Sequence, residues 1–412
     1  MKKNKTSRNF KKKRSSKFIL PMILLLLCGV WGWGSFFGEP KNEPADYILE
    51  DFSTPEPTVT PLKKGDNDPN SILEGMSLEE KIYQMIFTTP ESLTGMGSVI
   101  QAGETTKNAL AKRPIGGIIY FSSNIQTPEQ VKEMIKKSQS FSKIPLFIGV
   151  DEEGGRVSRI SGKSGMGFEK IPAMADIGAS GDADKAYEVG VKLGDMVGGL
   201  GFNVDFAPVA DIITNPENTE IGDRSFGKDP KMAAEMVKQV VLGLQENNVS
   251  AVLKHFPGHG STHANSHNGY SESGRTLEEM RAEEFKPFQA GIDAEADFVL
   301  VSHMSAINVD SSSKPASLSK IIIEDILRKE LGYEGIVTTD SLSMGAITER
   351  YSSGETAVMA VLAGVDVLLI PADLAGAYNG ISAAVSSGRI SEERIDESVF
   401  RIISLKIKRG IL

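Results

Sequence analysis

Short runs of β-branched and aromatic residues alternate along the chain with stretches of helical character. Seven runs are clear, and an eighth near residues 84–87 is weaker. Strands that alternate with helices form parallel sheets, and eight of them in about 340 residues favour a closed barrel. The sequence therefore predicts an α/β fold with a single (β/α)8 barrel of the TIM type. The seven clear runs are Gly116–Phe121, Leu146–Asp151, Asn203–Pro208, Ala251–His255, Asp297–His303, Gly335–Asp340 and Asp366–Ile370.

Three sequence patterns mark where helices of this barrel begin. Ser77–Glu80 has the spacing of a capping box, in which the first side chain and the glutamate three residues later cap each other's backbone. Thr127–Glu129 places a capping threonine before a proline, which is tolerated in the first helical turn. Ser391 precedes a C-terminal helix whose apolar residues recur on one face, namely Ile395, Val399, Ile402 and Leu405.

The N-terminus has a different character from the rest of the chain. Residues 1–17 contain nine Lys or Arg and no acid, and residues 18–37 carry no charge. A 20-residue helix is about 30 Å long, which matches the hydrocarbon thickness of a bilayer. We therefore expect a basic cytoplasmic segment at 1–17, then a transmembrane anchor at 18–37, with everything after it outside the cytoplasm. A cleaved signal segment is the alternative, although no A-x-A-like site follows the apolar run.

Two further features delimit the folded part. Residues 38–70 are rich in Pro, Asp, Glu, Asn and Thr, and we expect a flexible tether there. Removing the nine N-terminal cations from 45 leaves 36 Lys and Arg against 54 acids, a net charge of −18 for residues 38–412. So acidic a segment is a poor partner for nucleic acid. Within it, we expect the barrel to occupy residues 71–412. Cys28 is the single cysteine and excludes an intramolecular disulfide, while lipid attachment to it remains an alternative to the plain anchor.

Polar residues follow several of the predicted strands. Asp151, Lys254 with His255, His303 and Asp340 all fall at the C-terminal edge of a run. In a TIM barrel this edge carries the active site, because the loops after the strands converge there. The chain has no G-x-S-x-G motif, so carboxylates are the remaining candidates for a nucleophile. Asp340 would be held rigidly at the barrel mouth, as attack on an anomeric carbon requires.

Four histidines are spaced by four residues, at 255, 259, 263 and 267. On a helix this spacing would place them on one face, as a metal site requires. Pro257 and the neighbouring glycines instead predict a loop, so we expect no metal.

The glycine-rich turn at 149–159 has neither a dinucleotide nor a P-loop spacing. Asp151 with Arg156 or Arg159 suits polyhydroxyl recognition, although either arginine could form a structural ion pair.

Four segments together carry a resemblance to a known family: GVDEEGGRVSR (149–159), DRSFG (223–227), KHFPGHGSTHANSH (254–267) and TDSLSM (339–344). From about Ser71 onward the chain resembles glycoside hydrolase family 3, and specifically its single-domain β-N-acetylhexosaminidases. The resemblance implies hydrolysis with retention through a glycosyl-aspartate on Asp340, with His267 as the acid/base and no metal or organic cofactor. It also implies that sugar hydroxyls bind to Asp151, Arg159, Arg224, Lys254 and His255.

The sequence departs from the family pattern beside the acid/base. Asn265 stands where the family has an aspartate that orients the imidazole, and Glu152 replaces the commoner Gln. An amide oxygen can still fix the tautomer but supplies no charge. We expect a retaining exo-β-N-acetylhexosaminidase that acts on cell-wall or amino-sugar glycans. The alternatives are a β-glucosidase or phosphorylase of the same family, and a catalytically degenerate wall-associated sugar-binding protein. The sequence makes no prediction about oligomeric state.

Overall fold

The structure is a computed structural model, and it describes residues 68–262 and 271–412. The predicted basic segment 1–17, the predicted anchor 18–37 and nearly all of the predicted tether lie outside these residues. Asn265 and His267 also lie outside them. Within the two described ranges, no helix combines the length and the apolar character needed to cross a bilayer.

Eight parallel strands form a nearly closed barrel, which confirms the α/β barrel that the sequence predicts. Their order is β10-β1-β2-β3-β4-β5-β7-β9. A parallel bridge between Thr338 and Val367 links the two outermost strands. A separate two-stranded sheet pairs β6 with β8. The barrel strands are β1 (Ile86–Thr88), β2 (Gly117–Tyr120), β3 (Phe147–Val150), β4 (Val204–Asp205), β5 (Ser250–Phe256), β7 (Phe298–Val301), β9 (Ile336–Thr339) and β10 (Leu368–Leu369); the small sheet contains β6 (Glu272–Ser273) and β8 (Ser305–Ala306).

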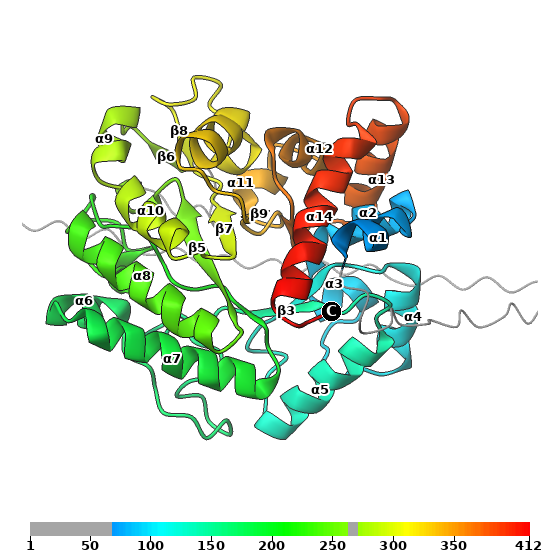
Figure 1. The fold of residues 1–412 in the computed structure, drawn as a ribbon, viewed down its shortest axis with the longest axis horizontal. Coiled ribbons are helices and arrows are strands. Elements are labelled where there is room, and N and C mark those ends of the chain that lie inside the picture. Colours follow the sequence, from blue (N-terminus) through cyan, green and yellow to red (C-terminus); the bar gives the residue numbers. More distant parts are fainter. Residues whose placement is uncertain (1–67, 263–270) are drawn as a thin grey trace, which may run out of the picture. The chain divides into compact units, whose positions relative to one another are not determined.

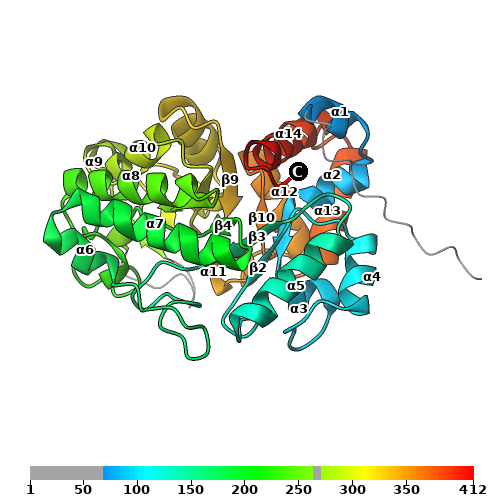
Figure 2. The same cartoon turned by 60° about the horizontal axis from the view of Figure 1, so that its bottom comes forward.

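Helices cover the outside of the strands (Figure 1). Helix α7 lies along α8, and α8 packs in turn against α10. Figure 2 shows the strands between these helices and a second group that contains α2, α13 and α14. The helices are α1 (Pro69–Glu74), α2 (Leu78–Gln84), α3 (Pro90–Thr94), α4 (Glu104–Lys112), α5 (Pro128–Phe141), α6 (Met174–Ser180), α7 (Ala183–Leu200), α8 (Pro230–Glu246), α9 (Leu277–Ala282), α10 (Phe285–Asp293), α11 (Gly345–Thr348), α12 (Ser353–Ala363), α13 (Leu374–Ser386) and α14 (Glu392–Lys408), with short helices η1 (Gly222–Arg224), η2 (His259–Ser261) and η4 (Ala316–Leu318) and a π-type helix η5 (Ile321–Glu330).

The helix starts read from the sequence are confirmed. Ser77 and Glu80 form the reciprocal capping box at the start of α2. The side chain of Thr127 accepts a hydrogen bond from the first turn of α5, and that of Ser391 does the same for α14. The apolar face of α14 is buried at all four expected positions, so this helix closes the barrel's outer layer. The first described helix, α1, begins at Pro69, two residues before Ser71.

The end of the barrel opposite the strands' carboxyl edge is filled by aromatic rings and one lysine. The Phe147 ring lies 5.6 Å from that of Phe87 and 5.4 Å from that of Phe298. Lys406 of α14 is fully buried beside them, with its Nζ 5.2 Å from the centre of the Phe147 ring. Its Nζ donates to Gln84 Oε1 at 2.8 Å. Burial lowers the pKa of Lys406 from 10.5 to about 7, because no carboxylate offsets the loss of solvation.

Candidate active site

A cavity of about 480 Å³ opens at the carboxyl edge of the barrel. Asp151 follows β3, Lys254 and His255 lie within β5, and Asp340 follows β9. The fold thus brings together six residues that the sequence predicts for the site, and all of them line this cavity: Asp151, Arg159, Arg224, Lys254, His255 and Asp340. The remaining two predicted residues, Asn265 and His267, lie outside the described part of the chain.

Backbone hydrogen bonds fix both the main chain and the carboxylate of Asp340. Its N–H donates to the carbonyl oxygen of Val301 at 2.9 Å, which continues the ladder between β7 and β9. The N–H of Ser341 donates to Asp340 Oδ1 at 2.7 Å. A carboxylate that accepts a backbone N–H keeps a defined orientation, so Asp340 is presented to the cavity by rigid backbone.

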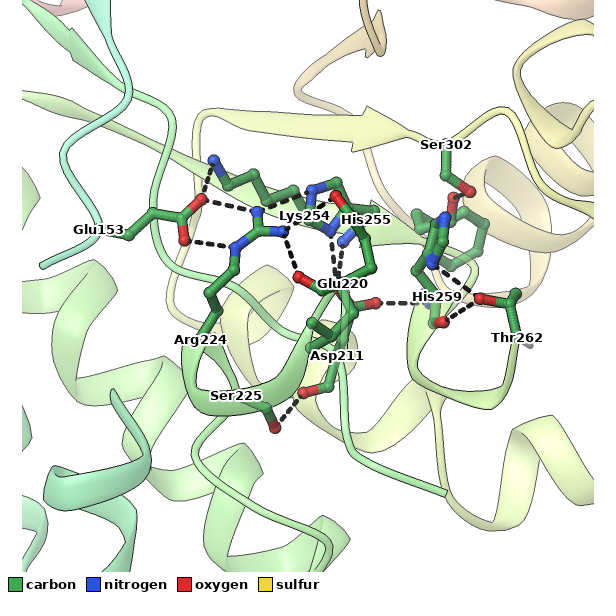
Figure 3. Close-up of polar contacts among 12 residues, drawn as sticks. Glu153, Asp211, Glu220, Arg224, Ser225, Lys254, His255, His259, Thr262 and Ser302 are labelled. Atoms are coloured by element: carbon green, nitrogen blue, oxygen red, sulfur yellow. Dashed lines mark hydrogen bonds and ion pairs between the residues drawn. The ribbon is translucent and has the colours of Figure 1, made fainter. Parts of the chain in front are cut away.

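Glu153 joins the two buried cations of the site (Figure 3). Arg224 donates to it through two nitrogens, Nε to Oε2 and Nη2 to Oε1, each at 2.8 Å. Lys254 Nζ lies 2.6 Å from Glu153 Oε1 and 2.7 Å from Asp151 Oδ1. The Lys254 and Glu153 side chains are only 3% and 2% exposed, so solvent hardly screens this network.

The charges of this network hold one another in the ionised form. Burial alone would raise the pKa of Glu153, but Lys254 and Arg224 outweigh burial and lower it far below the usual range. Burial alone would lower the pKa of Lys254, but Asp151 and Glu153 raise it. Lys254 and Arg224 therefore stay charged and can donate hydrogen bonds to a polar ligand in the cavity.

A second buried carboxylate, Asp211, holds the start of the loop that follows β5. Asp211 Oδ2 accepts from the backbone N–H of His255 at 3.1 Å and lies 2.7 Å from His255 Nδ1. Asp211 Oδ1 accepts from the N–H of His259 at 2.6 Å. Burial would raise the pKa of Asp211, but the two histidines lower it. Because Nδ1 of His255 faces a carboxylate, its Nε2 faces the cavity side, 3.2 Å from Arg224 Nη2 (Figure 3).

The turn after β3 contains Arg156 and Arg159, and the structure gives these two arginines different roles. Arg156 forms an ion pair with Asp223, 2.8 Å from Nε to Oδ1, and its Nη2 donates to backbone carbonyls of residues 219–221. Arg156 is therefore structural. Arg159 lines the cavity, and its buried Nε has no hydrogen-bond partner within the described residues. Because Arg159 lines the cavity and Arg156 does not, the guanidinium of Arg159 is the one placed to contact a ligand.

The buried carboxylate of Glu152 stabilises the same turn through hydrogen bonds. Its carboxylate accepts from the backbone N–H groups of Arg159 at 2.6 Å and Ile160 at 2.8 Å, and from the hydroxyl of Ser158 at 2.6 Å. A neutral glutamine amide has one acceptor oxygen, whereas both oxygens of Glu152 accept here. The replacement noted in the sequence thus strengthens a turn that places Arg159.

The two described histidines of the four-residue spacing do not share a helical face. His255 lies in β5 and His259 in η2, with their ring centres 6.0 Å apart. Across residues 68–262 and 271–412, no group of three or more His, Cys, Asp or Glu side chains is arranged to hold a metal ion.

Comparison with known proteins identifies the family. The sequence model of the N-terminal domain of glycosyl hydrolase family 3 matches residues 77–405. The chain belongs to glycoside hydrolase family 3. The family resemblance that the four sequence segments indicate is therefore confirmed.

Family 3 relatives named as hexosaminidases match most of the described chain. β-Hexosaminidase A of Pseudoalteromonas piscicida is 30% identical over 325 residues, which cover 73% of this chain and 54% of that protein. A β-hexosaminidase of Idiomarina loihiensis is 34% identical over 281 residues, 67% of this chain and 82% of that protein. The structure of a family 3 β-N-acetylglucosaminidase from Paenibacillus has a TM-score of 0.77 and 38% identity, covering 82% of this chain and 63% of that one. The chain thus spans little more than half of the first protein and less than two thirds of the solved structure.

Two buried carboxylates of this family 3 site were not predicted from the sequence. Glu153 lies in the glycine-rich turn at 149–159, where the sequence predicts a role only for its neighbours. Asp211 lies three residues beyond the run that predicts β4. Both are acidic residues shortly after a strand, a position that marks the active-site edge of a barrel. Applying the strand-end argument to every acid in the six residues after each run would have found them.

Proposed function

We propose that this protein is a retaining exo-β-N-acetylhexosaminidase. The observation that carries the proposal is the position of Asp340, held directly after β9 in the same cavity as Asp151, Arg224 and Lys254. Retaining glycosidases need a rigid carboxylate beneath the anomeric carbon and hydrogen-bonding groups around the sugar hydroxyls. The hexosaminidase names of the relatives support an N-acetylhexosamine as the sugar.

In the proposed reaction, Asp340 attacks the anomeric carbon while His267 gives a proton to the leaving glycosidic oxygen. This step forms a glycosyl ester on Asp340 and releases the rest of the glycan. His267, now neutral, then takes a proton from water, which attacks the same carbon and frees the aspartate. The sugar hydroxyls bind to the five substrate-binding residues, and these bonds strengthen as positive charge develops on the ring. The five are Asp151, Arg159, Arg224, Lys254 and His255. Well-placed proton transfer is worth about 10²–10⁴ in rate.

The test combines a variant with covalent trapping. Asp340→Ala should abolish turnover of an aryl N-acetyl-β-glucosaminide, and a fluorinated glycoside should label Asp340 in the unchanged protein. Glu349→Gln, an exposed carboxylate shortly after the same strand, is the matched control and should keep full activity. Labelling of a different carboxylate, or hydrolysis by the alanine variant at the normal rate, would contradict the assignment.

The acceptor and the natural glycan are part of the same proposal. We propose water as the acceptor and cell-wall-derived or amino-sugar oligosaccharides as substrates. Turnover of a panel of aryl β-glycosides with and without phosphate tests this choice. Faster release of the aryl group with phosphate, together with a sugar phosphate product, would identify a phosphorylase. Preference for a glucoside would identify a β-glucosidase, and no turnover of any substrate would favour a sugar-binding protein.

We also propose that residues 18–37 anchor the enzyme in a membrane, with the catalytic domain outside the cytoplasm. The support is the sequence: nine cations precede an uncharged segment of 20 residues. Protease added to intact protoplasts should digest the catalytic domain. Digestion that requires permeabilised cells would show the opposite orientation.

A further inference from the structure

His303 is a strand-end histidine that the proposed reaction does not use. It follows β7 by two residues and is fully buried, and it does not line the cavity. Strand-end polar residues in a TIM barrel face the active site, so a buried histidine in this position needs a physical explanation.

The hydrogen bonds of His303 define its tautomer. Nε2 lies 2.9 Å from the carbonyl oxygen of Ser341, which can only accept, so Nε2 carries a hydrogen. Nδ1 lies 2.8 Å from the hydroxyl of Ser317, which can donate to it. These two contacts fix the orientation of the ring and direct the Nε2 hydrogen at Ser341.

Ser341 connects this histidine to Asp340. The carbonyl oxygen of Ser341 is held by His303, and its N–H donates to Asp340 Oδ1 at 2.7 Å. The next residue, Leu342, donates its N–H to the carbonyl oxygen of Leu369 at 2.9 Å, at the end of β10. The backbone at Ser341 is therefore fixed by two neighbouring strands.

Ser317 is itself fixed from the same side of the barrel. Its N–H donates to the carbonyl oxygen of Ser302 at 3.0 Å, so η4 is tied to the end of β7. This backbone hydrogen bond holds Ser317 beside His303, the residue that follows Ser302. The contacts that reach the nucleophile run from His303, just after β7, through Ser341 to the carboxylate of Asp340, just after β9.

We propose that His303 is a positioning residue for the nucleophile. By holding the carbonyl oxygen of Ser341, it directs the N–H of Ser341 at Asp340 Oδ1 and thereby fixes the carboxylate's angle of attack on the anomeric carbon. The inference rests on the proposed function of Asp340. Misplacing a reacting group by about 1 Å can cost about 10²-fold in rate, so a loss of this size is expected when the contact is removed.

Two substitutions of His303 differ in which half of the imidazole they replace. His303→Gln keeps an N–H donor near the position of Nε2, and it can still bond Ser341. His303→Asn keeps a polar atom near the position of Nδ1, facing Ser317, but reaches no further. A positioning role through Ser341 predicts that Gln restores most of the activity and Asn does not. Ser317→Ala is the matched control, because it leaves the contact with Ser341 in place.

The experiment measures covalent labelling and ligand binding separately. The maximal rate of labelling by a fluorinated glycoside reports on attack by Asp340, and the Kd for N-acetylglucosamine reports on the sugar-binding groups. His303→Asn should lower the labelling rate about 10²-fold and leave the Kd within about threefold. His303→Gln and Ser317→Ala should each stay within about tenfold of the unchanged protein in labelling rate.

The outcomes separate this inference from the proposed function. If the unchanged protein labels on Asp340 and His303→Asn labels equally fast, the positioning role is wrong and the nucleophile stands. Equal losses for Gln and Asn, or a parallel weakening of the Kd, would show that His303 only supports the fold. If the unchanged protein neither hydrolyses nor becomes labelled, the proposed function fails and this inference fails with it. Should the Asn variant not fold, the comparison of Gln with Ser317→Ala decides: a Gln variant slowed more than tenfold beside an active Ser317→Ala refutes the donor role.

Discussion

Replacing Lys406, the buried lysine at the end of the barrel opposite the cavity, should change how the free energy of unfolding depends on pH. Lys406 has a pKa of about 7 in the folded protein and 10.5 as its ordinary value. Below pH 7 the lysine is protonated in both the folded and unfolded states, and the folded state bears the full cost of burying the charge. Between these two pKa values the unfolded chain binds one more proton, so stability rises with pH by about 1.4 kcal/mol per unit.

The variant Lys406→Met removes this titration and keeps a long apolar side chain. It leaves Gln84 Oε1 without its donor, at a cost of about 1–3 kcal/mol that does not vary with pH. The informative quantity is therefore the difference in unfolding free energy between the variant and the unchanged protein, followed across pH. From pH 6 to pH 9 this difference should change by about 3 kcal/mol, with the unchanged protein gaining.

Urea unfolding at several pH values gives this difference directly, from midpoints and slopes. Lys136→Met, an exposed lysine on α5, is the control and should show no such trend. A constant difference between the Lys406 variant and the unchanged protein from pH 6 to pH 9 would refute the reasoning. The charge of Lys406 would then be solvated in the folded protein.

Two further predictions concern the site. Glu153→Gln should destabilise the fold by about 3–5 kcal/mol and weaken N-acetylglucosamine binding, because Arg224 and Lys254 lose a buried counter-charge. The control Asp223→Asn breaks the exposed ion pair with Arg156 and should cost about 1 kcal/mol or less. Calorimetry that finds equal unfolding free-energy losses for the two variants would contradict this. Asn265→Asp should raise the deglycosylation rate and move the acidic limb of the pH–rate profile upward, because a carboxylate beside His267 raises its basicity. An active enzyme that depends on His267 and does not respond to Asn265→Asp would show that another group orients the imidazole.

The barrel was predictable because most of its strands lie in short runs of buried apolar residues that alternate with helical segments. The signal at residues 84–87 is weak because α2 ends at Gln84 and β1 begins at Ile86, so the helical and strand patterns meet within this segment. Its pairing with β10 joins positions almost 300 residues apart, and such closure is a property of the whole fold. Local patterns carry no information about it.

The site was predictable in its residue types and less so in their roles. The composition of the turn does not distinguish Arg156 from Arg159, and only the family resemblance selects Arg159. The structure supplies the physical reason, because Arg156 donates to the carbonyl groups of residues 219–221. Glu153 and Arg224 are 71 positions apart, and Asp211 and His255 are 44 apart. These contacts depend on how β3, β4 and β5 lie side by side. The sequence motifs therefore predict which polar residues are present, and the packing of the barrel strands determines which of them are in contact.

The order in which the site residues occur along the chain has a consequence for biosynthesis. Asp151 follows β3, whereas Asp340 follows β9, and β10 and α14 come later still. The cavity that Asp151 and Asp340 line together is therefore incomplete on a nascent polypeptide until β9 has been synthesised. The proposed glycosidase activity should likewise be absent from either fragment of a chain cut between β3 and β9, because the cut separates the two carboxylates.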